Sequence, residues 1–312
     1  MDRTAIAEAA VRIAPHIRRT PVAEIEGGLF GTIEPVVAKL ELLQHTGSFK
    51  PRGAFNRTLL AADAGAIPDA GVIAASGGNH GMAVAFAARS LGLPAEIFVP
   101  EVAPEIKVAK LREFGATVNI VEGIYDNAYT ACAERAEQTG ALLVHPFNQP
   151  DVITGQGTMA LEIEDQVPDV DTVLMSSGGG GLAAGAAAWF GSGKRIVAIE
   201  PETSCCFAAA LEAGEPVRVP ASGVAVDSLG AGIVGALAFD TLVANGAQSL
   251  LVTDDAIAET QRLLWDRMRL VVEPGGAAAA AALQSGAYAP AAGERVVVVI
   301  CGSNTDPNNV IG

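Results

Sequence analysis

Basic side chains are scarce in this sequence. Its 312 residues carry 20 Lys and Arg against 35 Asp and Glu, which gives a formal net charge of −15 at pH 7. Such a charge disfavours a broad surface for nucleic acid or for an anionic membrane. A small basic pocket that holds one phosphate or one carboxylate remains compatible with it.

Cysteine is also scarce. The four cysteines, Cys132, Cys205, Cys206 and Cys301, form no C-x-x-C pair and no zinc-finger spacing. So few cysteines in so long a chain indicate a reducing compartment rather than a disulfide or metal scaffold.

Long apolar runs are missing as well. No stretch of about 18 uninterrupted apolar residues is present, so a membrane-spanning helix is not expected. The first residues could be mistaken for a targeting peptide, but they include the acidic Asp2 and Glu8. We interpret them as an ordinary first helix, capped by Thr4, of a cytoplasmic protein.

What the sequence does contain is a regular alternation of short apolar runs and helical patterns. The runs are continuously apolar, as expected of parallel strands that are covered on both faces. This alternation predicts an α/β protein with parallel sheet. We expect strands at 36–41, 72–76, 95–99, 117–121, 141–145, 172–177, 195–200 and 295–301, and helices at 52–62, 82–92, Pro104 to 115, 127–139, 154–167, 182–190, 254–268 and 276–284. The Gly-rich segment 214–235 is predicted to be a long surface loop or a subunit contact.

Three segments have the composition of a chemical site. The first is HTGSFKPRGAF (45–55), in which Lys50 precedes Pro51 at a loop-to-helix junction. A lysine that is partly desolvated there can have a lowered pKa and form a Schiff base. The simpler alternative is a solvated surface lysine, because most lysines are exposed.

The second segment is SGGNHG (76–81), which follows a predicted strand and opens a helix. Its backbone N–H groups would bind an anion such as a carboxylate, and Asn79 could donate to an oxygen on a ring. His80 could be catalytic, but a single histidine at a helix start is more often a packing or capping residue.

The third segment is SSGGGGLAAG (176–185), which has the composition of a phosphate cradle at a helix N-terminus. The segment also fits a dinucleotide-binding fingerprint. Gly179, Gly181 and Ala184 match G-x-G-x-x-A, and Glu200 ends the next strand where such sites carry an acidic residue. On this segment alone, NAD and a single phosphate group fit equally well.

Taken together, the segments resemble the fold-type II family of pyridoxal-phosphate enzymes, and most closely the serine/threonine dehydratases (ammonia-lyases). NAD would leave the first two segments without a purpose. The matching segments keep the family's order: RIAPHIRRTPV (12–22), HTGSFKPRGAFN (45–56), SGGNHG (76–81), PFNQPDVITGQGT (146–158), SSGGGGL (176–182), VEPGGA (272–277) and CGSN (301–304).

The resemblance implies a cofactor, pyridoxal 5′-phosphate, and a role for each matching residue. Lys50 would bind the cofactor as a Schiff base and then remove the α-proton of the substrate. Asn79 would bind the cofactor's 3′-oxygen, and Phe49 would pack beside the ring unless it only fills the core. The implied cofactor-binding residues are Lys50, Phe49, Asn79, Gly178, Gly179, Gly180, Gly181, Leu182 and Cys301. The implied substrate-carboxylate loop is Ser76, Gly77, Gly78, Asn79 and His80.

Cys301 bears on the kind of reaction. The resemblance places it beside the pyridine nitrogen, where a neutral thiol stabilises a protonated ring less than a carboxylate does. That suits β-elimination better than transamination, although a buried apolar thiol is the ordinary alternative. We therefore expect dehydration of L-threonine or L-serine to a 2-oxo acid and ammonia.

Two positions depart from related racemases. The family's racemases carry a serine two residues before the cofactor-binding asparagine, whereas this chain has Gly77. The divalent-cation site of some relatives would use Glu200, but its second carboxylate position is Cys206, so we expect no tight divalent metal. Serine racemase, cysteine-synthase-like β-replacement, a non-enzymatic relative and, more weakly, an NAD-dependent oxidoreductase remain the alternatives.

The resemblance also implies an architecture. We expect the two-lobed α/β fold of fold-type II enzymes, which is like the tryptophan synthase β chain, with helices over parallel-rich sheets and the cofactor between the lobes. Residues 1–69 and 146–312 would form the large cofactor-binding lobe, and residues 70–145 would form the small substrate-loop lobe. A homodimer is expected.

Overall fold

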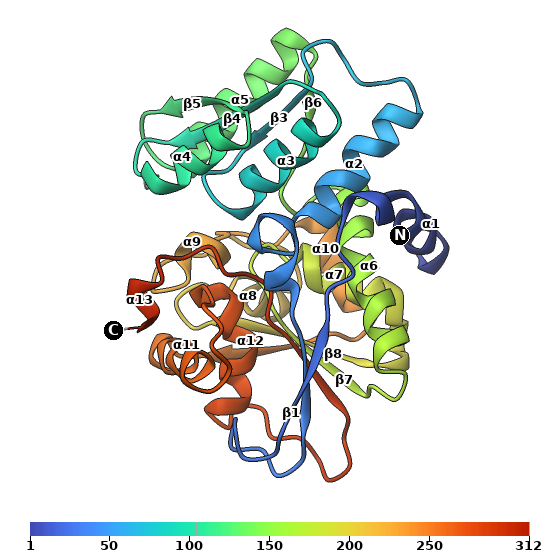
Figure 1. The fold of residues 1–312 in the computed structure, drawn as a ribbon, viewed down its shortest axis with the longest axis vertical. Helices are drawn as coiled ribbons and strands as arrows, with labels where there is room; N and C mark the ends of the chain where they lie inside the picture. The colour runs from blue at the N-terminus through green and yellow to red at the C-terminus, as the bar shows by residue number, and fades with distance from the viewer. Residues whose placement is uncertain (104, 312) are drawn as a thin grey trace.

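Two separate sheets organise the chain, as Figure 1 shows, in a computed structural model that describes residues 1–103 and 105–311. The larger sheet has the strand order β1-β2-β10-β7-β8-β9, and the smaller has the order β5-β4-β3-β6. The strands are β1 (Val22–Ile25), β2 (Val36–Lys39), β3 (Val72–Ala75), β4 (Ala95–Pro100), β5 (Thr117–Val121), β6 (Leu142–Leu143), β7 (Thr172–Ser176), β8 (Arg195–Pro201), β9 (Gln248–Val252) and β10 (Val296–Val299). All strand pairs are parallel except β1 with β2, which confirms the predicted α/β class.

The helices pack on both faces of each sheet. They are α1 (Arg3–Ile13), α2 (Pro51–Asp63), α3 (Asn79–Ser90), α4 (Glu105–Glu113), α5 (Tyr125–Thr139), α6 (Pro150–Gln166), α7 (Gly181–Phe190), α8 (Cys206–Ala213), α9 (Val226–Leu229), α10 (Ala236–Ala244), α11 (Asp254–Met268), α12 (Pro274–Gln284) and α13 (Asn308–Ile311). Among the described residues, none of these helices is long and apolar enough to cross a membrane.

The burial of β7 explains its continuously apolar sequence. On one face of the large sheet, Val173 and Met175 pack with α6, α7 and α10. On the other face, Leu174 packs with α11 and α12. Because successive side chains of a strand point to opposite faces, covering both faces buries every residue of β7.

The smaller sheet repeats this arrangement and lies above the larger one in Figure 1. Val72 and Ala74 of β3 share a core with α3 and α4, while Ile73 and Ala75 share another with α5. Its four strands fall between residues 72 and 143. The division into lobes at 70–145 remains a prediction, with which this arrangement agrees.

Several predicted boundaries are wrong in detail. The side chain of Asp2, and not of Thr4, caps α1 by accepting from the Ala5 N–H at 2.9 Å. The expected strand at 141–145 is only β6, which covers Leu142–Leu143. The helix predicted at 82–92 starts at Asn79, because Gly78 provides its N-cap. The predicted helix start at Pro104 lies outside the described residues.

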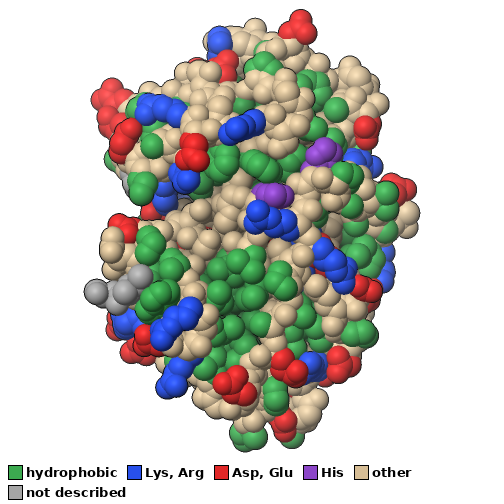
Figure 2. All heavy atoms as spheres, viewed as in Figure 1, with side chains coloured by type: hydrophobic (Ala, Val, Ile, Leu, Met, Phe, Trp, Pro, Cys, Tyr) green, Lys and Arg blue, Asp and Glu red, His purple; other side chains and the backbone are tan. Residues whose placement is uncertain are grey.

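Other elements were not expected from the sequence. β1 and β9 are partly exposed edge strands, and their apolar runs are short because Glu24 interrupts β1 and Gln248 and Ser249 begin β9. The predicted loop 214–235 contains the short helix α9, whose Leu229 is buried. On the face drawn in Figure 2, Lys and Arg are scattered among acidic side chains, and no broad basic patch forms there.

Candidate active site

The site is assembled where chain segments leave the carboxyl ends of β3, β7 and β10. The lysine loop is tied to the segment after β10, because the Phe49 N–H donates to the Cys301 carbonyl at 3.1 Å. Ser48 and Gly302 form an antiparallel bridge next to this bond. Residues 48–50 and 301–302, which lie at opposite ends of the chain, are therefore side by side.

Lys50 lies at the start of α2, where Pro51 takes the first helical position and needs no hydrogen-bond acceptor. Its Nζ donates to the Pro146 carbonyl at 3.0 Å and lies 5.1 Å from the centre of the Phe49 ring. Desolvation lowers the pKa of this amine to about 8, against the opposing effect of Cys301 and Glu273. A larger fraction of Lys50 is therefore neutral and nucleophilic at neutral pH than for an exposed lysine.

The tetraglycine follows β7 and leads into α7. Within the part of the chain that the structure describes, the backbone N–H groups of residues 178–182 donate to no protein acceptor. These groups stand at the positive end of a helix, where an anion such as a phosphate is stabilised.

At two of these four positions, stereochemistry explains why the residue is glycine. Gly180 has φ +85°, which favours glycine, and a Cβ on Gly179 would lie 2.4 Å from the ring of Phe147. Phe147 follows Pro146, the acceptor of Lys50, so the 146–147 segment joins the lysine to the glycine cradle. The sequence analysis included this segment in the resemblance but gave it no role.

The loop after β3 also leads into a helix with free backbone N–H groups, but unlike the tetraglycine it includes residues with polar side chains. Among the described residues, no acceptor receives the backbone N–H groups of Gly77, Asn79, His80 and Gly81, whereas the Gly78 N–H donates to Ser76 Oγ at 3.2 Å. The free N–H groups are suited to a carboxylate.

The side chain of His80 is directed away from that anion site. Its Nε2 donates to the Val144 carbonyl at 2.8 Å, and the residue is buried. Burial and the nearby Lys50 lower the pKa of His80 to about 3, so the ring is neutral. Any contact of His80 with a ligand at the anion site would involve its backbone N–H.

The sequence analysis missed two side chains that meet Asn79. Glu273 Oε1 accepts from Asn79 Nδ2 at 2.6 Å, and Asn304 Nδ2 donates to Asn79 Oδ1 at 2.7 Å. Both belong to segments that matched the resemblance, VEPGGA and CGSN, but neither spacing nor composition shows that they contact Asn79.

Comparison of the chain with known protein families explains this arrangement of residues. Residues 13–302 match the family described as pyridoxal-phosphate dependent enzyme. The chain belongs to this family. Pyridoxal phosphate is therefore its cofactor, and the recognition made from the sequence is confirmed.

Individual relatives of this pyridoxal-phosphate enzyme are similar over nearly its whole length. An L-threonine ammonia-lyase of Thermotoga maritima is 35% identical over 99% of this chain and 73% of its own. A phenylserine dehydratase of Ralstonia pickettii is 35% identical over 98% of this chain and 94% of its own. The structure of maize serine racemase superposes with a TM-score of 0.91 at 31% identity and covers 98% of this chain and 94% of its own. These likenesses confirm the fold-type II architecture.

The residues present fit the cofactor of this enzyme family. Lys50 offers an amine with a lowered pKa, and the free N–H groups of residues 178–182 offer a cradle for a phosphate. Cys301 is buried, and desolvation raises the pKa of its thiol to about 12, so it is neutral as expected. These residues would hold the aldehyde, the phosphate and the ring nitrogen of the cofactor.

The dinucleotide alternative does not fit this pyridoxal-phosphate enzyme. The carboxylate of Glu200 accepts from the N–H groups of Phe207 and Ala208, each at 2.8 Å, and from Ser249 Oγ at 3.2 Å. It therefore caps α8 and is fully buried, so it is not free to bind a ribose.

The neighbouring thiol of Cys206 donates to the Gly178 carbonyl at 3.3 Å. Among the described residues, no group of three or more His, Cys, Asp and Glu is placed to hold a metal ion. The expected absence of a tight divalent metal remains a prediction.

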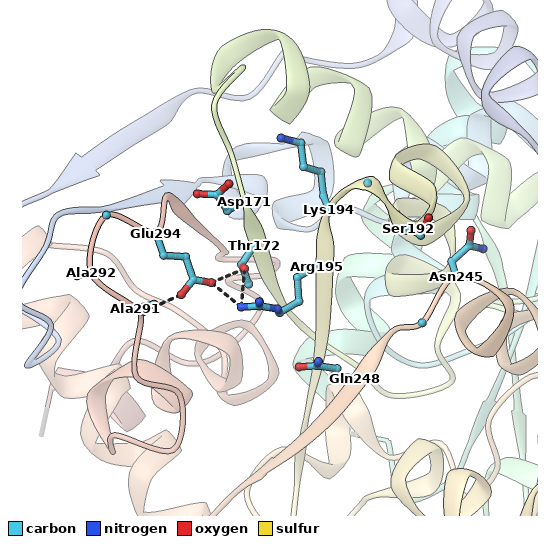
Figure 3. Close-up of a pocket in the computed structure, with 13 residues that line it drawn as sticks. Asp171, Thr172, Ser192, Lys194, Arg195, Asn245, Gln248, Ala291, Ala292 and Glu294 are labelled. Carbon is cyan, nitrogen blue, oxygen red and sulfur yellow. Dashed lines mark hydrogen bonds and ion pairs between the residues drawn. The ribbon is translucent and has the colours of Figure 1, made fainter.

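A separate pocket of about 660 Å³ lies at the amino ends of β7, β8 and β9, away from Lys50. Figure 3 shows that three of its polar side chains, those of Thr172, Arg195 and Glu294, bind one another. Glu294 accepts from Arg195 Nη1 at 2.9 Å and also from the Thr172 hydroxyl. We assign this pocket no part in the reaction.

Proposed function

We propose that this enzyme dehydrates and deaminates a β-hydroxy-α-amino acid, with L-threonine and L-serine as its substrates. The products are a 2-oxo acid and ammonia. The observation that carries the proposal is one amine of lowered pKa, Lys50, placed with two sets of free backbone N–H groups. One set is suited to the cofactor phosphate and the other to the substrate carboxylate.

The bound cofactor withdraws electrons from the substrate Cα and so acidifies its proton. Lys50 Nζ accepts that proton, because its lowered pKa keeps part of the amine neutral at neutral pH. The N–H groups of Gly77, Asn79, His80 and Gly81 hold the substrate carboxylate and so orient the Cα–H bond toward Lys50. The Cβ–O bond breaks as the electron pair of the former Cα–H bond forms the Cα=Cβ bond, and the hydroxyl leaves as water with one proton, which balances the proton that Lys50 removed. The released enamine tautomerises to an imine, which one water molecule hydrolyses to the oxo acid and ammonia.

Gly77 supports elimination over racemisation. A racemase needs a second acid–base group on the other side of the substrate, and the family's racemases place a serine at this position. A side chain here would also be crowded, because a Cβ on Gly77 would lie 3.1 Å from the Cβ of Ala103. Lys50 is therefore the base that we assign to the reaction.

The test compares two lysines. Lys50→Ala should lower ammonia release from serine and threonine by at least about 10³-fold, as expected when a covalent and acid–base residue is lost. Lys194→Ala, in the separate pocket, should leave the rate unchanged. Borohydride reduction followed by peptide mapping should locate the cofactor on Lys50. Full activity of Lys50→Ala would refute the proposal.

A panel of substrates tests which amino acid the enzyme prefers and which reaction it catalyses. Relatives of similar identity include the phenylserine dehydratase and an L-threo-3-hydroxyaspartate ammonia-lyase of a Pseudomonas species. Oxo-acid formation should be measured with serine, threonine, phenylserine and hydroxyaspartate, and D-serine formation by chiral chromatography. O-acetylserine with sulfide tests the β-replacement alternative. We expect the highest kcat/KM with threonine or serine.

We also propose a homodimer, as implied by the resemblance. Figure 2 shows apolar side chains gathered on the lower half of the face drawn, and such a patch is typical of a protein interface. Analytical ultracentrifugation should give twice the chain mass of 31.7 kDa. A species of one chain mass at micromolar concentration would contradict it.

A further inference from the structure

The side-chain amide of Asn79 is held at both ends by residues far away in the sequence. Its Nδ2 donates to Glu273 Oε1 at 2.6 Å, and its Oδ1 accepts from Asn304 Nδ2 at 2.7 Å. Asn304 is itself anchored, because the same Nδ2 donates to the Thr46 carbonyl at 2.7 Å. Thr46 lies in the loop that leads to Lys50.

These partners determine which way the amide faces. An ionised carboxylate can only accept hydrogen bonds, and the amide nitrogen of Asn304 can only donate. The oxygen of Asn79 must therefore face Asn304, and its nitrogen must face Glu273. Of the two N–H bonds on Asn79 Nδ2, one is used by Glu273 and the other remains available to a ligand.

The side chain of Glu273 does not stabilise its own helix, α12. It occupies the N-cap of α12, yet its side chain makes no capping hydrogen bond there. Ser228 Oγ instead accepts from the Gly275 N–H at 3.2 Å. Glu273 is 4% exposed, and among the described residues no Lys or Arg forms an ion pair with it. Burial of such a carboxylate is costly unless it is hydrogen-bonded, so the contact with Asn79 is its main compensation.

We propose that Glu273 and Asn304 are positioning residues that hold Asn79 as a hydrogen-bond donor toward the 3′-oxygen of the cofactor. The proposal rests on the contact of Asn79 with that oxygen, which the resemblance implies, and not on the choice of substrate. Glu273 acts as the carboxylate form, because its protonated form would offer a donor where Asn79 also offers one. Neither residue touches the reacting atoms of the substrate.

The surroundings of Glu273 make this contact sensitive to pH. Desolvation raises the pKa of Glu273 to about 7, while Asn79, Lys107 and Lys50 lower it and Asp227 raises it. Cys301 also faces Glu273, but its thiol is neutral. Below about pH 7, protonation of Glu273 replaces one of its two acceptor oxygens by a donor and so weakens its hold on Asn79.

The experiment measures cofactor binding by apo-protein and needs no turnover. Glu273→Ala and Asn304→Ala should each weaken the affinity for pyridoxal phosphate by about 10-fold and shift its visible absorption band. Glu273→Gln offers one acceptor oxygen and one donor, as protonated Glu273 does, so its affinity should match that of the wild type below pH 7. It should lack the additional change in affinity that the ionisation of Glu273 causes around pH 7, while keeping the dependence that is due to Lys50. Lys194→Ala is the matched control and should change neither quantity.

A double-mutant cycle separates a positioning role from a structural one. If Glu273 acts through Asn79, the variant with both Asn79→Ala and Glu273→Ala should bind the cofactor no more weakly than Asn79→Ala alone. Additive losses, or an unchanged affinity and absorption band in Glu273→Ala, would overturn the proposal. Should Glu273→Ala fail to fold, the pH dependence of Glu273→Gln still decides. A wild-type protein that binds the cofactor but releases no ammonia would refute the proposed function alone.

Discussion

The two ends of the large sheet treat their polar groups differently. At the carboxyl ends of β7 and β10, the N–H groups of residues 178–182 lack protein acceptors within the described chain, and the Lys50 amine has a lowered pKa. At the amino ends, in the pocket of Figure 3, the hydroxyl of Thr172, the guanidinium of Arg195 and the carboxylate of Glu294 bind one another. Polar groups left without partners, and not the volume of a pocket, therefore mark the site.

The largest difference between the two ends of the sheet is expected when one methyl group is added to a glycine at each end. Gly179→Ala places a Cβ 2.4 Å from the Phe147 ring and must distort the cradle. We expect at least about 100-fold weaker binding of pyridoxal phosphate, because the cradle relies on several backbone N–H groups at once. Fluorescence titration of the apo-protein measures this affinity.

The matched control is Gly193→Ala in the pocket at the amino ends, where an added Cβ meets no atom within 4 Å. It should bind the cofactor like the wild type. Equal losses in the two variants would show that the cradle has no special place in binding.

The rate at which the apo-protein captures the cofactor should depend on pH through the ionisation of Lys50. The neutral amine is the nucleophile, so capture by the apo-protein should rise about tenfold per pH unit below the amine's pKa and level off near pH 8. An exposed lysine, with a pKa near 10.4, would keep rising to about pH 10. Stopped-flow absorbance at a series of pH values distinguishes the two, and a rise that continues to pH 10 would contradict the burial argument.

A smaller effect is expected at the carboxylate loop. Gly77→Ser adds the hydroxyl that the family's racemases carry at this position and should introduce measurable serine racemisation. Elimination should fall roughly 2- to 5-fold because the Cβ is crowded by Ala103. Combining it with Ala103→Gly should relieve the crowding. Gly77→Ala carries the same Cβ without a hydroxyl and should not racemise. Chiral chromatography of the serine pool measures the outcome, and racemisation by the wild type would count against our assignment.

The smallest effect on activity is expected at the amino ends. Glu294→Gln weakens a half-exposed ion pair with Arg195 and the bond to the Thr172 hydroxyl. We expect a loss of about 1 kcal/mol in the free energy of unfolding, a melting temperature a few degrees lower, and an unchanged kcat. Thermal unfolding alongside the ammonia assay tests this. A large loss of activity without a loss of stability would give this end of the sheet a function.

Much of the fold could be predicted from local sequence. The buried strands β2, β3, β4, β7, β8 and β10 fall inside or close to their predicted ranges, because both faces of their sheets are covered and the strands are largely apolar. The partly exposed edge strand β5 also falls in its predicted range, 117–121. The edge strands β1 and β9 were missed because neither forms a long apolar run: β1 has four residues and includes Glu24, and β9 begins with Gln248 and Ser249. Thr4 was chosen as a cap over Asp2 although both side chains can cap a helix, and only the backbone geometry decides between them.

In the candidate site, too, some residues could be predicted from local sequence and others could not. Lys50, the tetraglycine and Asn79 stand in short motifs whose residue types already limit the chemistry. Glu273, Asn304 and Phe147 were missed because their importance comes from contacts with residues that are distant in the chain. The side chain of His80 is turned toward Val144, which no local pattern could show.

Local sequence was enough to predict the α/β fold, because apolar runs and glycine turns act through local backbone geometry, and the pyridoxal-phosphate family was identified through the resemblance of its motifs. Which buried polar groups find hydrogen-bond partners became visible only in the folded chain. Glu200 is used to cap α8, whereas Glu273 is left to hold Asn79. The physical reason is that hydrogen bonding and desolvation depend on neighbours in space, which the folded chain brings together from both of its ends.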